Sequence, residues 1–218
     1  MLIAGVDDAG RGPVIGPLVI AGVLFKNYEV AKLRELGVKD SKTLTPKRRT
    51  ILSREVKRLA IQWEALEFSP SEVDKIVIEG RKYHRLNWFE AMGMAEIIRK
   101  LHPAVAYVDA SDVDEARFAR QIKETVPFDL EVVSEHRADR NYTIVGAASI
   151  IAKVHRDEAI SLLREKYGDF GSGYSSDPKT RRVLLSWIDN GGDLPDCVRK
   201  SWKTVKGLID SRGANLSH

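Results

Sequence analysis

The sequence predicts an α/β fold, a mixed five-stranded sheet flanked by helices, followed by a helical C-terminal region. Short apolar stretches with the composition of buried strands are interspersed with longer amphipathic ones. Short links between the first strands favour antiparallel pairing, whereas helical crossovers between the later ones favour parallel pairing. The last quarter of the chain shows helical patterns only. We therefore expect residues 1–168 to contain the sheet and residues 169–218 to be helical.

The strands are expected where runs rich in Leu, Ile, Val and Ala end at Gly, Pro or polar residues. A turn rich in Gly and Pro at 10–17 joins the first strand to the second. The expected strands cover residues 2–7, 16–25, 61–68, 104–109 and 130–133.

The helices are expected from their capping signals. Thr45 stands before Pro46, the favoured order of N-cap and first helical residue. Ser69 and Glu72 have the spacing of a capping box, and Asp112 and Asp177 are further candidate N-caps. The expected helices cover about 46–60, a stretch after 69, 87–101, a stretch from 112 to 125, 143–167, 177–190 and 195–211.

Composition narrows the class of protein. Of the 218 residues, 43% are hydrophobic and 30% charged, which favours a well-filled core over disorder. The net charge of +4 and the pI of about 9.1 are compatible with nucleic-acid binding but are weak support for it. Cys197 is the only cysteine, which excludes an internal disulfide and favours a reducing compartment. With no signal peptide or membrane-spanning run, we expect a cytoplasmic protein.

Carboxylates follow the apolar strands directly. Asp7 and Asp8 end the first, Asp109 ends the fourth, and Asp139 lies just past the fifth. Because ligands of open α/β sheets gather at the carboxyl ends of strands, these acids can converge on one edge. Buried carboxylates are costly unless compensated, and hard cations such as Mg²⁺ and Mn²⁺ prefer oxygen ligands. A metal site is one interpretation.

The other interpretation is that these acids are ordinary turn and N-cap residues. This interpretation is the better one for Asp112, Asp114 or Asp177 taken alone, because Asp so often caps helices. Asp7 and Asp8 differ, since two adjacent buried charges repel each other unless a cation is present. Neighbouring residues of a regular strand point to opposite faces, so the pair can share a site only if the strand ends or kinks there.

Basic and aromatic residues point weakly to nucleic acid. Two basic clusters could follow a phosphate backbone, although each alone is more typical of a solvated face. Tyr174, in a polar loop, could stack on a sugar or base. The histidines lack metal-ligand spacing. The first cluster contains Lys39, Lys42, Lys47, Arg48 and Arg49, and the second contains Arg199, Lys200, Lys203 and Lys206 with Trp202 among them.

A series of motifs, in order along nearly the whole chain, resembles ribonuclease HII, the type 2 ribonuclease H, and most of all its archaeal members. Any one motif is weak, whereas the ordered set is highly specific. The motifs are Gly5-Val-Asp7-Asp8-Ala-Gly10-Arg11-Gly12, Lys39-Asp40-Ser41-Lys42, Tyr107-Val-Asp109-Ala, Arg137-Ala-Asp139, Ala147-Ala-Ser149-Ile-Ile-Ala-Lys153, Gly171-Ser-Gly-Tyr174 and Arg199-Lys-Ser-Trp-Lys203.

The resemblance implies an RNase H-like catalytic domain that hydrolyses the RNA strand of RNA–DNA hybrids and incises 5′ to single ribonucleotides in duplex DNA. It implies two divalent ions, Mg²⁺ or Mn²⁺, and a role in ribonucleotide excision repair. The implied catalytic and metal-binding residues are Asp7, Asp8, Asp109 and Asp139. The implied substrate-binding residues are Gly10, Arg11, Gly12, Lys42, Arg137, Ser149, Lys153, Tyr174 and Arg199.

Two residues depart from the family pattern. Asp8 stands where the family usually has Glu, and Ser175 stands where archaeal relatives usually have Pro. The Asp side chain is shorter by about 1.5 Å, which weakens direct coordination of a metal. An alternative is therefore a hybrid-binding protein with weakened or lost catalysis, and a third is a phosphatase or nuclease of other specificity. We expect a monomer with no membrane contact, and the tail shows no clear sliding-clamp motif.

Overall fold

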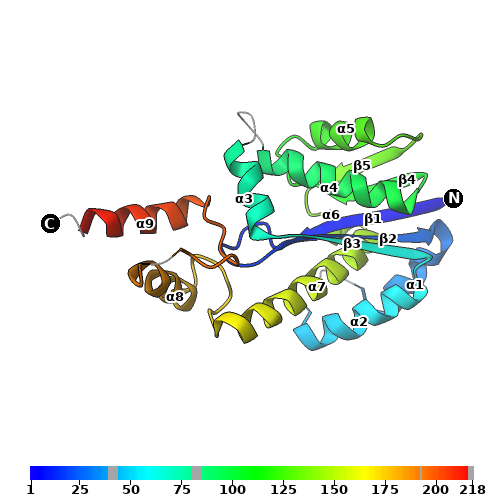
Figure 1. The fold of residues 1–218 in the computed structure, drawn as a ribbon. Helices are drawn as coiled ribbons and strands as arrows, with labels where there is room; N and C mark the ends of the chain where they lie inside the picture. Colours follow the sequence, from blue (N-terminus) through cyan, green and yellow to red (C-terminus); the bar gives the residue numbers. More distant parts are fainter. Residues whose placement is uncertain (39–43, 80–84, 192, 216–218) are drawn as a thin grey trace. The chain divides into compact units, whose positions relative to one another are not determined.

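The fold is a mixed five-stranded sheet flanked by helices, as the sequence predicts (Figure 1). The computed structural model describes residues 1–38, 44–79, 85–191 and 193–215. The strands follow one another across the sheet in the order β3-β2-β1-β4-β5. They are β1 (Leu2–Ala9), β2 (Leu18–Lys26), β3 (Gln62–Phe68), β4 (Val105–Asp109) and β5 (Glu131–Glu135).

Pairing within the sheet follows the lengths of the connections. Strand β1 runs antiparallel to β2, to which the short turn joins it, and parallel to β4. Strand β5 runs parallel to β4 after a helical crossover. The carboxyl ends of β1, β4 and β5 therefore lie at the same edge of the sheet, where Asp109 ends β4.

Most helices begin where their caps predict. The Thr45 hydroxyl accepts a hydrogen bond from the Arg48 amide, Ser69 and Glu72 form the capping box, and Asp177 accepts from the Lys179 amide. The helices are η1 (Asn27–Glu29), α1 (Val30–Glu35), α2 (Pro46–Leu59), α3 (Pro70–Glu79), α4 (Arg85–Leu101), α5 (Glu115–Thr125), α6 (Ala138–Asn141), α7 (Thr143–Tyr167), α8 (Pro178–Asp189) and α9 (Lys203–Asn215).

Two predicted helix starts are wrong. Asp114, not Asp112, caps α5, because the Asp112 carboxylate is buried and accepts hydrogen bonds from the Asp114 amide and from Arg117. The last helix begins at Lys203 rather than near Pro195. The chain before it cannot be helical, since the Arg199 amide donates to the Val14 carbonyl. The short helices η1, α1 and α6 were not expected.

The first of two compact units contains the sheet and comprises the described residues of 1–9, 19–67 and 82–155. Helices cover both faces of the sheet (Figure 1). A Cβ added at Gly5 would stand 2.3 Å from the Ile144 carbonyl oxygen, so α7 rests directly on β1. On the opposite face, Gly22 allows Ile97 of α4 the same close approach.

The second unit comprises the described residues of 10–18, 68–81 and 156–218. Its core packs Val14 and Ile15 of the first turn against Phe170, Val198 and Val205. The second unit consists of segments from three parts of the chain, so no single position in the sequence separates the two units. The boundary that we expect between residues 168 and 169 stays a prediction.

No helix within the described ranges is long and apolar enough to cross a membrane.

Candidate active site

The first pair of acids lies where the ladder between β1 and β4 has ended. That ladder ends at Val6 and Val108, while β1 continues alongside β2 through Ala9. The kink that would bring Asp7 and Asp8 to one face is absent, since β1 stays regular there. The Asp7 side chain is accordingly buried, at 3% exposure, and Asp8 is half-buried.

Asp7 is the electrostatic centre of the cluster. Burial raises its pKa well above the ordinary value, and the charges of Asp8 and Asp109 raise it further. The charge of Lys153 and a hydrogen bond from Ser149 act in the opposite direction. Lys153 also donates to the Ser149 hydroxyl, Nζ to Oγ, at 2.7 Å. The structure thus brings Asp7, Asp109, Ser149 and Lys153 together in the first unit, while Asp8, on the opposite face of β1, still acts on Asp7 through its charge.

Asp139 is connected to the same edge of the sheet through Asp109. The Ala138 amide donates to Asp109 Oδ1 at 2.8 Å, so the carboxylate that ends β4 also holds the first residue of α6. Arg137, just before this helix, has a left-handed backbone with φ of 59°. This turn leaves Asp139 buried, at 3% exposure, in the first turn of α6.

Glu135, at the end of β5, holds the other end of α6, and sequence reasoning missed it. Its Oε1 accepts from the Tyr142 hydroxyl at 2.5 Å, and its Oε2 accepts from Asn141 Nδ2 at 3.1 Å. The hydrogen bond to Glu135 raises the pKa of Tyr142 to about 12. The sequence did contain a signal for Glu135, because this residue is the last of its strand, just as Asp109 is the last of β4.

The acids fit a hard divalent cation by their chemistry. All are carboxylates, and burial, followed by the charges of Asp8 and Asp109, makes the ionised form of Asp7 costly, a cost that a cation would offset. Within the described ranges, no three Asp, Glu, His or Cys side chains are already grouped as ligands around one ion. Instead, the charge of Lys153 and a hydrogen bond from Ser149 partly compensate Asp7.

The turn at Gly10-Arg11-Gly12 belongs to the second unit. Gly10 has a φ of 92°, a conformation that favours glycine, and an added Cβ there would stand 2.6 Å from Arg156 Cδ. A Cβ at Gly12 would lie 3.5 Å from the Tyr174 ring, so the turn and the tyrosine are neighbours. Burial lowers the pKa of Arg156, and neither its Nε nor its Nη2 has a hydrogen-bond partner among the described residues.

Arg199 lies beneath this turn, not on the surface where a direct phosphate contact would place it. It is fully buried, and its guanidinium donates to three backbone carbonyls. The acceptors are Gly16 at 3.1 Å from Nε, Arg11 at 2.8 Å from Nη1 and Gly10 at 2.5 Å from Nη2. In the structure Arg199 supports the backbone of the turn.

Tyr174 is carried by a loop with a defined conformation. Gly171 and Gly173 both have a φ of 79°. The Gly173 amide donates to the Thr180 hydroxyl at 3.0 Å, and its carbonyl accepts from the Val14 amide at 2.8 Å. The Tyr174 side chain is 44% exposed and available to a ligand. Lys42, in the predicted Lys39–Lys42 motif, lies outside the described residues.

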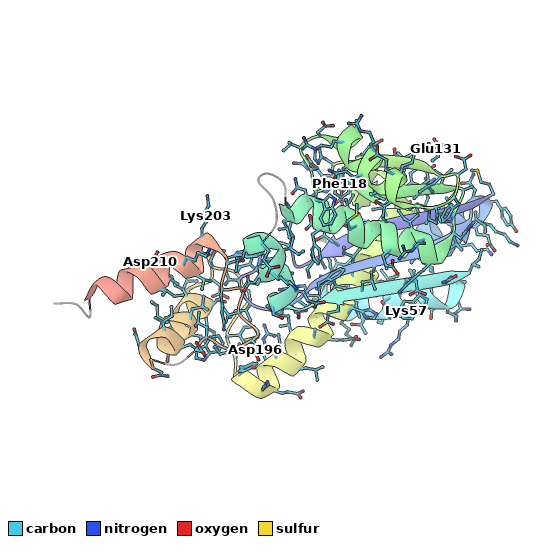
Figure 2. All side chains as sticks on the ribbon, turned by 45° about the horizontal axis from the view of Figure 1, so that its top comes forward. Lys57, Phe118, Glu131, Asp196, Lys203 and Asp210 are labelled. Atoms are coloured by element: carbon cyan, nitrogen blue, oxygen red, sulfur yellow. The ribbon has the colours of Figure 1, made fainter. Side chains whose placement is uncertain are left out.

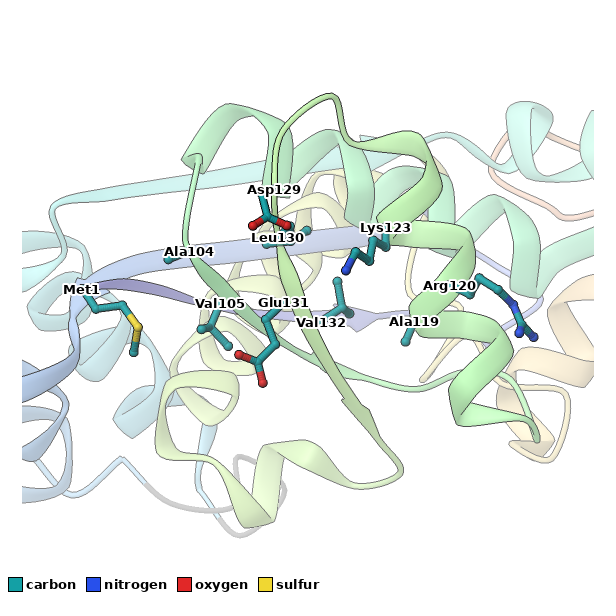
Figure 3. Close-up of a pocket in the computed structure, with 10 residues that line it drawn as sticks. All are labelled: Met1, Ala104, Val105, Ala119, Arg120, Lys123, Asp129, Leu130, Glu131 and Val132. Carbon is teal, nitrogen blue, oxygen red and sulfur yellow. The ribbon is translucent and has the colours of Figure 1, made fainter.

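A cavity of about 550 Å³ in the first unit is a separate feature (Figure 3). Ala104, Val105, Leu130 and Glu131 line it at the amino ends of β4 and β5. Because Asp109 ends β4 at its carboxyl end, the cavity lies at the opposite edge of the sheet from the acids.

Comparison with known proteins establishes first the class of enzyme and then the family. The fold is that of a metal-dependent endoribonuclease of the RNase H-like class. The family model described as Ribonuclease HII matches residues 4–205. The chain belongs to the ribonuclease HII family, whose activity is hydrolysis of RNA in RNA–DNA hybrids.

Archaeal relatives match almost the full chain. Ribonuclease HII of Thermococcus onnurineus is 47% identical over 210 residues, which cover 95% of this chain and 90% of the relative. The crystal structure of ribonuclease H2 from Pyrococcus horikoshii has a TM-score of 0.89 at 43% identity, covering 97% of this chain and 98% of that one. The PCNA:RNase HII complex from Archaeoglobus fulgidus has a TM-score of 0.84 at 47% identity, covering 93% and 96%.

Proposed function

We propose that the protein incises duplex DNA 5′ to a single ribonucleotide, besides hydrolysing the RNA strand of hybrids, and that it uses two divalent ions. The observation that carries this proposal is the buried Asp7, whose pKa is raised by burial and then by the charges of Asp8 and Asp109. A site that holds several carboxylates together at this cost is suited to bind cations.

The acids have distinct roles in this proposal. Asp7 and Asp109 would hold both ions, Asp8 would help to hold one of them, and Asp139 would assist the ion that serves the leaving group. The bound ions would supply activation of the attacking water and stabilisation of the leaving oxygen. Lys153 and Ser149 orient the Asp7 carboxylate and reduce its charge repulsion before the ions bind.

The glycine turn and Tyr174 supply the choice of substrate. The ribose 2′-hydroxyl is the group that distinguishes RNA from DNA, and a turn without side chains at Gly10 and Gly12 lets backbone groups approach it closely. Tyr174 is exposed beside Gly12. In this proposal its ring would pack at the junction between ribonucleotide and deoxyribonucleotide. Lys42 and Arg137 would contact the phosphate backbone.

Cleavage of a duplex with one ribonucleotide tests the proposal, with all-DNA and all-hybrid duplexes of the same sequence as controls. We expect incision 5′ to the ribonucleotide with Mg²⁺ or Mn²⁺, leaving 3′-hydroxyl and 5′-phosphate ends. Cleavage of the hybrid alone would reject the single-ribonucleotide activity. Equal cutting of all-DNA duplex would indicate a nuclease of other specificity.

The number of ions is a separate question. Titrating Mn²⁺ into the protein in a calorimeter would give two binding events under the proposal. If one bound Mn²⁺ ion sufficed for full activity, the proposal of two ions would be wrong, while the proposed substrate would be unaffected.

A sliding clamp is a candidate partner. This partner is supported by the Archaeoglobus fulgidus relative, which was solved as a PCNA:RNase HII complex, although the tail of this chain shows no clear clamp motif. Gel filtration of the full chain with an archaeal clamp would show a joint peak if the two bind.

A further inference from the structure

Asp74 is a buried acid that the catalytic cluster does not explain. It lies in α3, in the second unit, and is 8% exposed. Its Oδ2 accepts from the Lys200 amide at 2.7 Å, and its Oδ1 accepts from the Ser201 amide at 3.0 Å and from the Ser201 hydroxyl at 2.5 Å. The carboxylate thus holds the two residues that directly follow Arg199.

Arg199 connects these residues to the glycine turn through its backbone and its side chain. Its amide donates to the Val14 carbonyl at 2.8 Å, while its guanidinium donates to the carbonyls of Gly10 and Arg11 and stacks 4.9 Å from the Trp202 ring. A guanidinium that is buried and held on several sides has little freedom to move. Fixing the chain at Lys200 and Ser201 therefore fixes the turn.

The direction of the peptide groups shows what this arrangement does. In a trans peptide the C=O of one residue and the N–H of the next point in opposite directions, and no peptide bond of the described chain is cis. Because Arg199 draws the carbonyls of Gly10 and Arg11 toward itself, the N–H groups of Arg11 and Gly12 must point away from it. Two adjacent backbone donors with a common direction suit a hydroxyl or phosphate oxygen.

We propose that Asp74 is a positioning residue for substrate selection, acting with Ser201 through Arg199 to aim the Arg11 and Gly12 amides at the ribonucleotide. This inference rests on the proposed single-ribonucleotide function and adds the residues that make its turn rigid. None of the three needs to touch the substrate. Their effect is on the preference for ribose over deoxyribose, not on the chemical step.

The test compares binding of two matched duplexes, one with a single ribonucleotide and one all-DNA, by fluorescence anisotropy without divalent metal. The wild-type protein should prefer the ribonucleotide duplex, and Asp74→Asn should reduce this preference about tenfold, the equivalent of ~1.4 kcal/mol. Asp210→Asn, which removes an exposed carboxylate of α9, is the matched control and should keep the wild-type preference (Figure 2).

Arg199→Lys should lower the preference too, and the Asp74→Asn/Arg199→Lys double variant should show no further loss, because both residues act through one connection. Melting temperatures set an assay temperature at which every variant is folded. If Asp74→Asn does not fold, Ser201→Ala removes one hydroxyl donor and should give a smaller loss in the same direction.

A folded Asp74→Asn protein that keeps the wild-type preference would overturn the inference, and so would additive losses in the double variant. Absence of any preference in the wild-type protein would instead overturn the proposed single-ribonucleotide function on which the inference rests. The two failures are therefore separate.

Discussion

For single residues of the candidate site, the sequence predicts which positions could carry the chemistry more readily than it predicts what each side chain contacts. Asp7, Asp8 and Asp109 could be found because acids that end apolar strands are costly without compensation. Arg199 could not be placed, since a basic residue in a basic cluster reads as a surface residue, while its burial depends on carbonyls of a turn far away in the sequence. Asp74 had no sequence signal, because its partners are amides of a distant loop.

Asp8 gives the first prediction at this scale. Asp8→Glu should raise the rate of hybrid hydrolysis, because the extra methylene extends the reach of the carboxylate by about 1.5 Å and leaves its charge unchanged. Steady-state cleavage with Mg²⁺ and with Mn²⁺ measures the effect. Asp8→Asn, which removes the charge, should lower the rate. An unchanged or lower rate for Asp8→Glu would mean that the shorter side chain is not what limits the site.

Gly10 gives the second prediction at the scale of single residues. Gly10→Ala would place a Cβ 2.5 Å from the Pro17 carbonyl oxygen and 2.6 Å from Arg156, at a φ of 92°. We expect a loss of about 1–3 kcal/mol in the free energy of unfolding and a loss of ribonucleotide preference. Gly168→Ala is the control, because Gly168 has a φ of 79° and open space around it. That variant should keep full activity, and equal damage in both would assign the effect to backbone strain alone.

At the scale of elements, capping chemistry predicted the helix starts that depend on neighbours in sequence, including the starts of α2, α3 and α8. It failed where a cap is decided by distant residues. Asp112 has the spacing of an N-cap, but Arg117 and Asn87 occupy its carboxylate. The short α6 was invisible because it is held by Asp109 and Glu135 rather than by its own periodicity.

Asp112 makes the anchoring of α5 depend on pH. Burial alone would raise its pKa, but hydrogen bonds from Arg117, the Asp114 amide and Asn87 lower it from the ordinary 3.8 to about 2. A lowered folded pKa contributes stability above the unfolded value, and that stability is lost as the pH falls through the folded value. The difference in unfolding free energy between wild type and Asp112→Asn should therefore shrink between pH 4 and pH 2.

Chemical denaturation at several pH values would measure this difference. Glu131→Gln, at an exposed carboxylate of β5, serves as the control (Figure 2) and should show no such convergence with the wild type. A gap between wild type and Asp112→Asn that stays constant down to pH 2 would contradict the assignment.

At the scale of the molecule, the mixed pairing followed from the connection lengths, whereas the order of the strands across the sheet came only from the structure. The net charge of +4 was the weakest guide to function, because it does not show that Asp7, Asp8, Asp109 and Lys153 lie close enough for their charges to interact. The family is shown by the family model and the relatives along the chain, while the geometry shows which contacts the motifs make where the structure describes them.

Stability should be coupled to metal binding. Asp7 has a raised pKa, so its ionised form costs the folded state free energy at neutral pH, and stability rises as the pH falls. Asp7→Asn should stabilise the metal-free protein by about 1 kcal/mol while abolishing activity. The melting temperature of the wild type should rise with Mn²⁺, and that of Asp7→Asn should respond much less. Equal shifts in both proteins would place the ion elsewhere.

The close approach of the Ile144 carbonyl to Gly5 has a consequence for the spacing between the strand and the helix that carry the candidate site. The strand that bears Asp7 and the helix that bears Ser149 and Lys153 are kept at their distance by one absent carbon atom. A methyl group added there, two residues before the acid, would wedge the helix away and separate reacting groups that it never contacts. Loss of activity in such a variant would resemble the loss of a reacting group, although its cause would be a larger distance between strand and helix.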